Sequence, residues 1–349
     1  MRLAVVLFNL GGPDRLEAVR PFLSNLFSDP AIIRAPGFVR RPLARFIAER
    51  RAPVARKIYS KIGGRSPILP ETELQARALE AALARHGHDA KCFIAMRYWH
   101  PSTGETAGAV KAFAPERIVL LPLYPQYSTT TTGSSRDEWE RSAAAAKLDV
   151  PTSEICCYPA EGGFIAALTS RVREALSRTR PDVSYRLLFS AHGLPKRIVD
   201  GGDPYRWQVE RTVEAALAAL DKEGLDWSIC FQSRVGPLEW IGPATEAEVR
   251  RAGAGGKGVV MVPVAFVSEH SETLVELDIE YAELARRSGV PDYIRAGTVR
   301  DHPEFIAALA GLVAVAINAQ IPVSCVPGRL CPARRICGQE RRQRRKRYA

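Results

Sequence analysis

The sequence contains no apolar run long enough to cross a membrane. Its longest uncharged apolar stretch, 305–317, is well short of the roughly 20 residues that a spanning helix needs, and it favours a buried helix. The apolar run at 3–8 is too short for a secretory signal peptide, and we interpret it as a first β-strand. These absences favour a cytoplasmic protein, in which disulfide bonds are rare.

The sequence also lacks the two common glycine-rich phosphate-binding loops. The segment Asn-Leu-Gly-Gly-Pro at 9–13 contains neither Gly-x-Gly-x-x-Gly nor Gly-Lys-Ser/Thr. Its glycines instead allow a ligand to approach the backbone closely. The hydroxyl-rich segment 125–135 is interpreted as a turn that caps the next helix, with a phosphate site as the less favoured alternative.

Acidic residues are in the minority, since 38 Asp and Glu face 49 Lys and Arg, for a net charge of +11. The excess lies in two segments: 34–57 holds eight basic residues against one Glu, and 325–349 holds nine against one. The remaining chain is mildly acidic, which argues against a nucleic-acid-binding fold. Apolar residues alternate with arginines over 30–57. This segment is therefore either a solvated amphipathic helix or the edge of a cleft, where it would contact the anionic lipids on the inner face of the membrane.

Short apolar runs alternate with amphipathic or alanine-rich stretches along most of the chain. Strands are predicted near 3–8, 91–98, 117–123, 153–158, 185–190, 227–232 and 258–266, and helices near 72–86, 103–114, 162–179, 207–223, 243–253, 271–288 and 303–320. This alternation is typical of parallel sheets covered by helices on both faces, so we predict an α/β fold.

Three short motifs recur in the same order in the two parts of the chain. The segment 7–13 resembles 188–195, 93–101 resembles 229–237, and 121–124 resembles 262–265. We therefore expect two similar doubly wound halves, Rossmann-like or flavodoxin-like, with a ligand cleft between them at the carboxyl ends of the strands. The expected divisions are 1–150 (completed by the helix at 303–320), 151–302, and a cysteine-containing extension with a basic tail at 321–349.

The most informative segment contains four glutamates around His270. In an α-helix Glu272, Glu276 and Glu280 would share one face, and no nearby Lys or Arg relieves a repulsion of about 0.2–0.5 kcal/mol for each like pair. A solvated helix start would explain Glu269 and Glu272 through the helix dipole, but not the other two. We therefore predict a carboxylate row that handles a cation or protons, with His270 and Glu272 at its inner end, as suits a divalent first-row metal.

His192 follows an apolar strand, in the second copy of the 9–13 turn. A neutral imidazole there can accept a proton or bind a metal near neutral pH. A structural loop histidine is the alternative, but the place at a strand's carboxyl end favours a functional role.

Taken together, these motifs closely resemble the signatures of the ferrochelatase family. The matching segments run from about residue 3 to 318 and include 9–13, Tyr59 with 63–67, 122–128, 190–195, 201–205, 232–243 and 262–281. The resemblance implies a lyase of the chelatase fold, monomeric or homodimeric, that inserts Fe²⁺ into protoporphyrin IX to form protohaem, the last step of haem biosynthesis. A chelatase for another tetrapyrrole (cobalt insertion, or iron into coproporphyrin) and a non-catalytic haem or metal carrier are the alternatives.

The resemblance also implies roles for individual residues. His192 and Glu272 would handle the iron and the pyrrole protons, with either one as the base. The residues that would conduct metal inward or protons outward are Glu269, His270, Glu276 and Glu280. The residues that match porphyrin-binding positions are Leu10, Tyr59, Trp240 and Phe266, which would wall the cleft, and Ser66 and Arg97 near it. For Trp240 and Phe266, ordinary core packing is the alternative.

Three of the seven cysteines, Cys325, Cys331 and Cys337, lie among Pro, Gly and Arg after the last predicted helix. In a reducing cytosol, metal ligation is the favoured use. The resemblance implies a [2Fe–2S] cluster, whose fourth ligand would be Cys157 or Cys156, since side chains alternate along a strand. The spacing departs from the Cys-x₂-Cys-x₄-Cys of the animal enzymes, whose cysteine in the Pro-Gln-Tyr-Ser turn is replaced here by Thr129. Zn²⁺ on the same four thiolates is the alternative.

Overall fold

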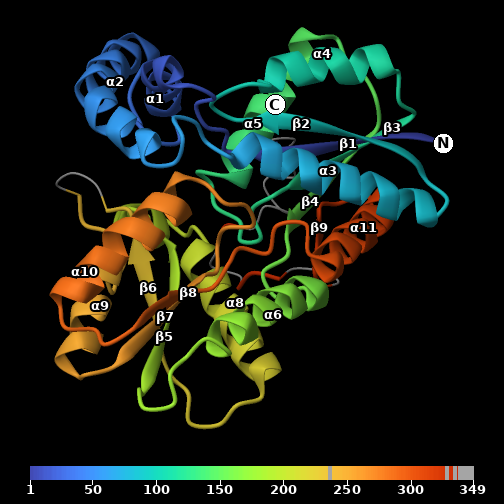
Figure 1. Ribbon diagram of the computed structural model, residues 1–349. Coiled ribbons are helices and arrows are strands. Elements are labelled where there is room, and N and C mark those ends of the chain that lie inside the picture. The colour runs from blue at the N-terminus through green and yellow to red at the C-terminus, as the bar shows by residue number, and fades with distance from the viewer. Residues whose placement is uncertain (235–237, 327–329, 333–335, 337–349) are drawn as a thin grey trace. The chain divides into compact units, whose positions relative to one another are not determined.

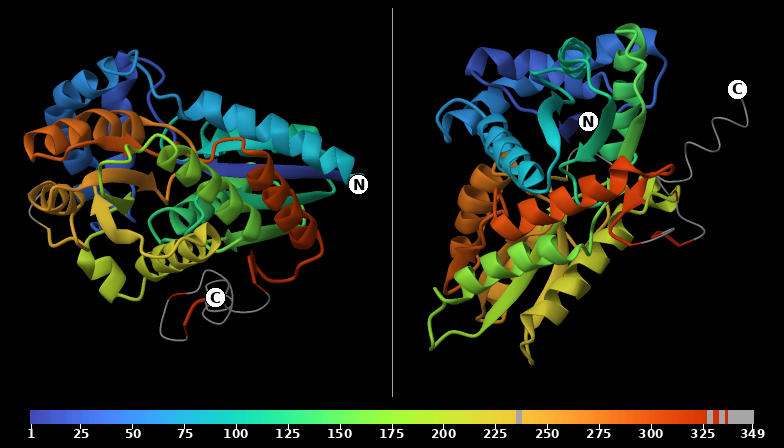
Figure 2. Two further views of the ribbon diagram at one scale, coloured as in Figure 1. Left: turned by 60° about the horizontal axis from the view of Figure 1, so that its bottom comes forward. Right: turned by 90° about the vertical axis from the view of Figure 1, so that its right-hand side faces the viewer.

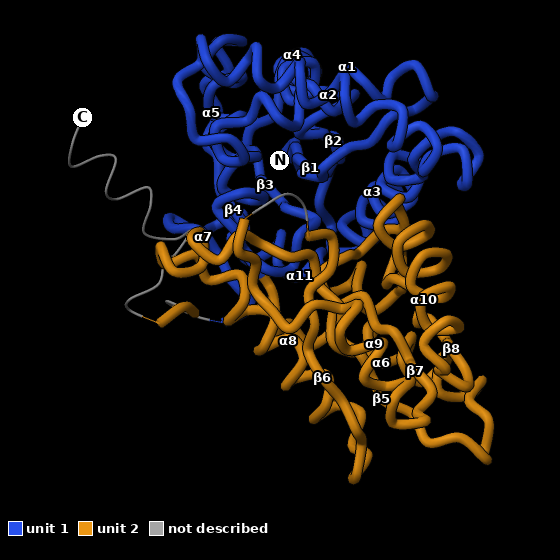
Figure 3. The backbone as a smooth tube through the Cα atoms, turned by 90° about the vertical axis from the view of Figure 1, so that its left-hand side faces the viewer, with its two compact units in different colours: residues 1–157, 309–328, 338–349 blue, residues 158–308, 329–337 orange. Residues whose placement is uncertain are grey.

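A computed structural model describes residues 1–234, 238–326, 330–332 and 336. The described chain forms two compact units (Figure 3): the first contains 1–157 and 309–326, and the second contains 158–308, 330–332 and 336. The first unit thus extends past the expected boundary at 150, because the next strand pairs with its sheet.

The first unit is built on a parallel sheet with the strand order β2-β1-β3-β4-β9. The strands are β1 (Arg2–Asn9), β2 (Asp89–Met96), β3 (Arg117–Pro122), β4 (Thr152–Cys157) and β9 (Val323–Ser324). The helices are α1 (Val19–Phe27), α2 (Gly37–Ser60), α3 (Ile68–Arg85), α4 (Thr103–Phe113) and α5 (Thr132–Ala145). In Figures 1 and 2 the strands lie between α3 on one side and α4 and α5 on the other, so both faces of β1 are buried.

The second unit has a parallel sheet with the order β6-β5-β7-β8. The strands are β5 (Tyr185–His192), β6 (Asp226–Gln232), β7 (Gly258–Pro263) and β8 (Tyr293–Arg295). The helices are α6 (Gly162–Leu176), α7 (Lys196–Asp200), α8 (Tyr205–Leu220), α9 (Thr245–Ala254), the π-helix η2 (Glu272–Glu280) and α10 (Tyr281–Arg287). The helix α11 (Pro303–Ile317) is divided between the two units.

The two sheets repeat one topology, which explains the recurring motifs. The orders β2-β1-β3-β4 and β6-β5-β7-β8 correspond strand for strand. Backbone contacts at the strand ends also repeat: the Met96 N–H donates to Pro101 O at 2.8 Å, and the Phe231 N–H donates to Pro243 O at 2.9 Å. The predicted α/β class with two parallel sheets is confirmed.

Several elements of the fold differ from the expectation, and the helices α1 and α7 are among those that were not predicted. The strands β8 and β9 were not predicted, because three and two residues are too few to show an alternation of apolar and polar side chains. The segment expected as one α-helix over 271–288 is a π-helix over Glu272–Glu280, followed by α10. Because a π-helix bonds i to i+5, residues four apart no longer repeat on one face.

The segment 30–57 forms a turn and most of α2, whose outward side chains include large apolar residues. Phe38 is 82% exposed, and Val39, Leu43, Phe46 and Val54 are also exposed. Among the described helices none is both long enough and apolar enough to span a membrane.

Candidate active site

The candidate site of the second unit lies where three strands of its sheet end. His192 ends β5 and is paired in register with Gln232, which ends β6. The chain that leaves β7 passes through 264–271 into η2, and so brings Glu272 to the same edge. Because the carboxyl ends of parallel strands meet at one edge, residues far apart in sequence converge here.

His192 and Glu272 form a direct pair. The distance between His192 Nδ1 and Glu272 Oε2 is 2.9 Å, and both side chains are partly buried. Burial opposes the charge on His192, but the Glu272 carboxylate outweighs it and raises the pKa of the imidazole. Burial likewise opposes the charge on Glu272, but His192 and His270 hold the pKa of the carboxyl well below its usual range.

His270 flanks the same carboxylate from within the loop before η2. Its Nδ1 lies 3.1 Å from the carbonyl of Ser268, which makes Nδ1 the donor, and its Nε2 lies 3.7 Å from Glu272 Oε2. The Phe266 ring lies against His270 with centroids 4.7 Å apart. Glu272 therefore has an imidazole on each of two sides.

Glu276 is held by four donors. These are Gln232 Nε2 at 2.9 Å, the Ser233 N–H at 2.8 Å, the Ser233 hydroxyl at 2.5 Å and the Tyr281 hydroxyl at 2.9 Å. Burial and the neighbouring Glu272 nevertheless raise the pKa of this carboxyl. Ser233 adopts φ +61°, a left-handed conformation that costs a non-glycine residue about 1 kcal/mol or more, so the contacts to Glu276 hold strained backbone.

The other two glutamates of the segment have different surroundings. Glu269 pairs with Arg295 at 2.9 Å and accepts two bonds from Thr298. Burial opposes its ionisation, but Arg295 lowers the pKa of the Glu269 carboxyl. Glu280 is exposed at the far end of η2.

Trp240 lies next to the turn that follows His192. It forms an antiparallel bridge with Pro195, and a Cβ on Gly193 would come within 3.2 Å of the Trp240 ring and 2.8 Å of the carbonyl of Gln232. Only glycine fits there without a shift. Of the six porphyrin-site residues expected from the sequence, Trp240 and Phe266 thus lie beside the His192 pair.

The other four belong to the first unit and are described within it. Leu10 packs with Tyr98 and Trp99, and Tyr59 packs with Val19 and Ala52. Ser66 lies against Gly12, where a Cβ would come within 2.6 Å of it. Arg97 pairs with Asp29 at 3.0 Å and donates to the hydroxyl of Ser134 at 2.8 Å.

The cysteines of the extension are only partly described. Strand β4 pairs with β9 so that Cys157 lies opposite Ser324. Cys325, the next residue along the chain, therefore lies near Cys157. In the second unit Cys331 is buried, and its Sγ accepts a hydrogen bond of 3.3 Å from Gln208 Nε2. Cys337 lies outside the described residues. Within the described ranges, no three His, Cys, Asp or Glu side chains gather as a ready metal site.

Sequence reasoning missed three residues that shape this site: Gln232, Ser233 and Tyr281. All three hold Glu276, and Gln232 Nε2 also donates to the backbone carbonyl of Glu272. Their signal was only positional, since Gln232 ends the predicted strand 227–232, Ser233 follows it, and Tyr281 directly follows the acidic row. Because Gln232, Ser233 and Tyr281 are uncharged, no charge pattern in the sequence pointed to them.

The fold is that of the chelatases. The sirohydrochlorin chelatase SirB from Bacillus subtilis subspecies spizizenii, solved with cobalt, aligns with a TM-score of 0.52 at 12% identity and covers 91% of this chain and 96% of its own. SirB from Bacillus subtilis with Fe³⁺ aligns at 0.50, with 14% identity and the same coverage. This likeness defines the class by its fold alone.

Sequence comparison narrows the class to one family. Residues 2–317 match the ferrochelatase family. The ferrochelatase of Caulobacter vibrioides (strain NA1000 / CB15N) is 56% identical over 314 residues, 89% of each chain, and that of Phenylobacterium zucineum is 56% identical over 335 residues, 95% of this chain and 96% of its own. The ferrochelatase of Pelagibacter ubique is 49% identical over 315 residues, 90% of this chain and 91% of its own. The chain belongs to the ferrochelatase family, whose lyases insert Fe²⁺ into protoporphyrin.

Proposed function

We propose that this chain inserts Fe²⁺ into protoporphyrin IX to form protohaem, and that the His192–Glu272 pair carries the chemistry. The 2.9 Å contact between His192 Nδ1 and Glu272 Oε2, at the carboxyl edge of the sheet, is the observation that supports this most directly. The insertion requires two pyrrole N–H protons to leave while Fe²⁺ sheds its water.

In this proposal His192 is the proton acceptor. Glu272 engages Nδ1, which orients the ring and leaves Nε2 to take a proton. The carboxylate stabilises the imidazolium that results, as the raised pKa of His192 indicates. His192 must lose any proton it already holds before it can act. Glu272 supplies the oxygen that Fe²⁺ meets as it sheds water, with His270 on its other side.

Glu276 then relays protons away from the pair. Its raised pKa lets it take up a proton more readily than an ordinary carboxyl, and its donors from Ser233 and Tyr281 stabilise the ionised state to which it returns. Exposed Glu280 forms the outer end of this path. Glu269 has a bond to Arg295, so its part is to hold the loop that carries His270 rather than to carry ions.

Each unit contains residues that we propose contact the porphyrin. Trp240 and Phe266 supply apolar faces next to the His192 pair, and Leu10 and Tyr59 supply them in the first unit. Ser66 can donate to a propionate, and the guanidinium of Arg97 adds positive charge.

The extension would hold a metal centre through Cys157, Cys325, Cys331 and Cys337. Two contacts support this proposal: in the first unit β9 brings Cys325 next to the pairing of Cys157 with Ser324, and in the second unit Gln208 donates to the buried sulfur of Cys331, as an amide does to a metal-bound thiolate. No three of the described donors gather at one place in the structure. A [2Fe–2S] cluster there would supply one-electron chemistry and tie the extension to the body. Zn²⁺ is the competing occupant.

The exposed apolar and basic face of α2 supports a peripheral place on the membrane. Phe38, Leu43 and Phe46 project among the arginines of this helix, a pattern that suits the interface of an anionic bilayer. We accordingly place the protein in the cytoplasm at the inner face of the membrane.

A His192→Ala substitution tests the proposal. Loss of the proton acceptor should lower Fe²⁺ insertion by about 10²–10⁴-fold while the protein stays folded. The rate of protohaem formation under low oxygen measures the effect, with circular dichroism as the check on folding. The matched control is His86→Ala, an exposed histidine at the end of α3, which should keep full activity. Near-normal turnover in the His192 variant would refute the assignment.

A further inference from the structure

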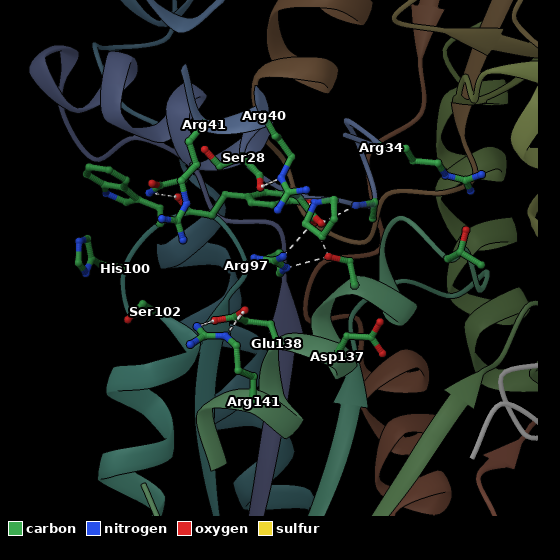
Figure 4. A pocket seen from close by; sticks show the side chains of 18 residues that line it. Ser28, Arg34, Arg40, Arg41, Arg97, His100, Ser102, Asp137, Glu138 and Arg141 are labelled. Carbon is green, nitrogen blue, oxygen red and sulfur yellow. Dashed lines mark hydrogen bonds and ion pairs between the residues drawn. The ribbon is translucent and has the colours of Figure 1, made fainter. Parts of the chain in front are cut away.

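The first unit contains a large cavity in which Arg97 is the only lining residue assigned above to the porphyrin. Its volume is about 940 Å³, and it is bordered by the turn before α2, the start of α2, the loop after β2 and the first turns of α5 (Figure 4). All of its lining residues belong to the first unit, whereas the His192 pair belongs to the second.

Arginine dominates the charged lining. Five arginines face three carboxylates there: Arg34, Arg40, Arg41, Arg97 and Arg141 against Asp29, Asp137 and Glu138. Two of the arginines are neutralised, since Arg97 pairs with Asp29 at 3.0 Å and Arg141 pairs with Glu138. The third carboxylate, Asp137, lies 3.7 Å from Arg136, which is outside the lining.

Three lining arginines, Arg34, Arg40 and Arg41, have no carboxylate partner among the described residues. Arg40 donates instead to the carbonyls of Ser28 at 2.8 Å and Ala35 at 2.5 Å. These neutral acceptors fix its guanidinium without cancelling its charge. The cavity therefore has uncompensated positive charge, which favours an anionic ligand.

The framework around these charges is fixed in advance. One oxygen of Asp29 accepts from the Tyr98 hydroxyl at 2.7 Å and the Ser134 hydroxyl at 2.5 Å, besides its pair with Arg97. The negative charge of Asp29 is thus neutralised by Arg97 and by two hydroxyl donors, so it repels an anionic ligand less than an unpaired carboxylate would. In Figure 4, Arg41 projects from α2 toward the space that Arg97 and Arg141 also border.

We propose that this cavity binds a small oxyanion of the phosphate type. Guanidinium groups recognise phosphate by paired N–H donors, and groups held in place before binding lose little entropy when they bind. The phosphate is either free in solution or the headgroup of an anionic lipid, since Phe38 and Val39 expose apolar surface in the first turn of α2 next to Arg40 and Arg41.

Calorimetric titration of the full-length protein with inorganic phosphate, at constant ionic strength, tests the free form. Arg41→Gln should weaken binding about tenfold because it removes an uncompensated charge. Glu138→Gln should tighten binding, because Arg141 then loses its competing partner. Arg77→Gln, at an exposed position of α3, makes the same charge change outside the cavity and should leave binding unchanged.

Vesicles of phosphatidylglycerol, compared with vesicles of phosphatidylcholine, test the lipid form by sedimentation. Binding to phosphatidylglycerol that falls more in Arg41→Gln than in Arg77→Gln supports the headgroup as the source, and phosphate binding with the same ranking supports the free ion. Equal losses in both variants, or no binding in either assay, would overturn the proposal. Competition between phosphate and protoporphyrin would also overturn it, since the arginines would then belong to the porphyrin site.

Discussion

At the scale of single residues, the two histidines beside Glu272 are held in different ways. His270 is tied through Nδ1 to a backbone carbonyl, which fixes its tautomer, whereas His192 is tied through Nδ1 to the carboxylate itself. For His192 the carboxylate of Glu272 raises the pKa of the imidazole. This difference is why the proton acceptor is assigned to His192.

A Glu272→Gln substitution should move the pH dependence of the reaction. Without the carboxylate, burial lowers the pKa of His192, so the unprotonated ring persists to lower pH. The acidic limb of the kcat/KM profile should shift to lower pH while kcat falls, and NMR titration of the His192 ring should report the same shift. If the acidic limb of the kcat/KM profile does not shift, a group other than His192 is responsible for it.

The same pair should make stability depend on pH. The raised pKa of His192 stabilises the fold below the unfolded imidazole value and loses this effect as pH rises through the folded pKa. The lowered pKa of Glu272 stabilises the fold above the unfolded carboxyl value and loses the effect as pH falls. Both contributions are present between the reference values of 4.5 and 6.5, so Glu272→Gln should lower Tm more at pH 5.5 than at pH 9.

At the scale of the elements, the turn after β5 leaves no room for a side chain at Gly193. A Gly193→Ala substitution should cost about 1–3 kcal/mol of stability, since its Cβ would come within 2.8 Å of the carbonyl of Gln232. Turnover should also fall, because the displaced backbone is next to His192. Chemical denaturation and kcat/KM measure the two effects.

The control is Gly108→Ala in α4, where an added Cβ meets no atom within 4 Å. It should gain about 0.5–1 kcal/mol, because alanine is the better helix former. A Gly193 variant as stable as this control would show that the turn relaxes freely.

Some of these elements could be predicted from the sequence and others could not. Short apolar runs such as 3–8 and 258–266 predicted most of the strands, and His192 was identified from its place just after the predicted strand 185–190. The π-helix was not predicted, because its residues have the composition of an ordinary amphipathic helix and only i to i+5 bonding separates the two. The strained backbone at Ser233 was equally unpredictable, since it depends on the contact between the Ser233 N–H, after β6, and Glu276, on η2.

At the scale of the whole molecule, the extension should be the source of any colour in the purified protein. Cys331→Ser should abolish a visible iron–sulfur absorption and lower the iron and sulfide content. Cys92→Ser, a substitution within β2, should retain both. If the wild-type protein is colourless and contains stoichiometric zinc, the cluster assignment is wrong and the cysteines bind Zn²⁺.

The order of the chain has a consequence for synthesis. The first unit takes its edge strand, β9, and residues 309–317 of α11 from the end of the sequence, after the whole second unit has been made. A nascent chain that has released only residues 1–157 therefore exposes an edge of β4 that awaits its partner. At about 5–20 residues per second, that edge stays open on the ribosome for roughly ten seconds or more. During this interval the open edge can pair with another chain.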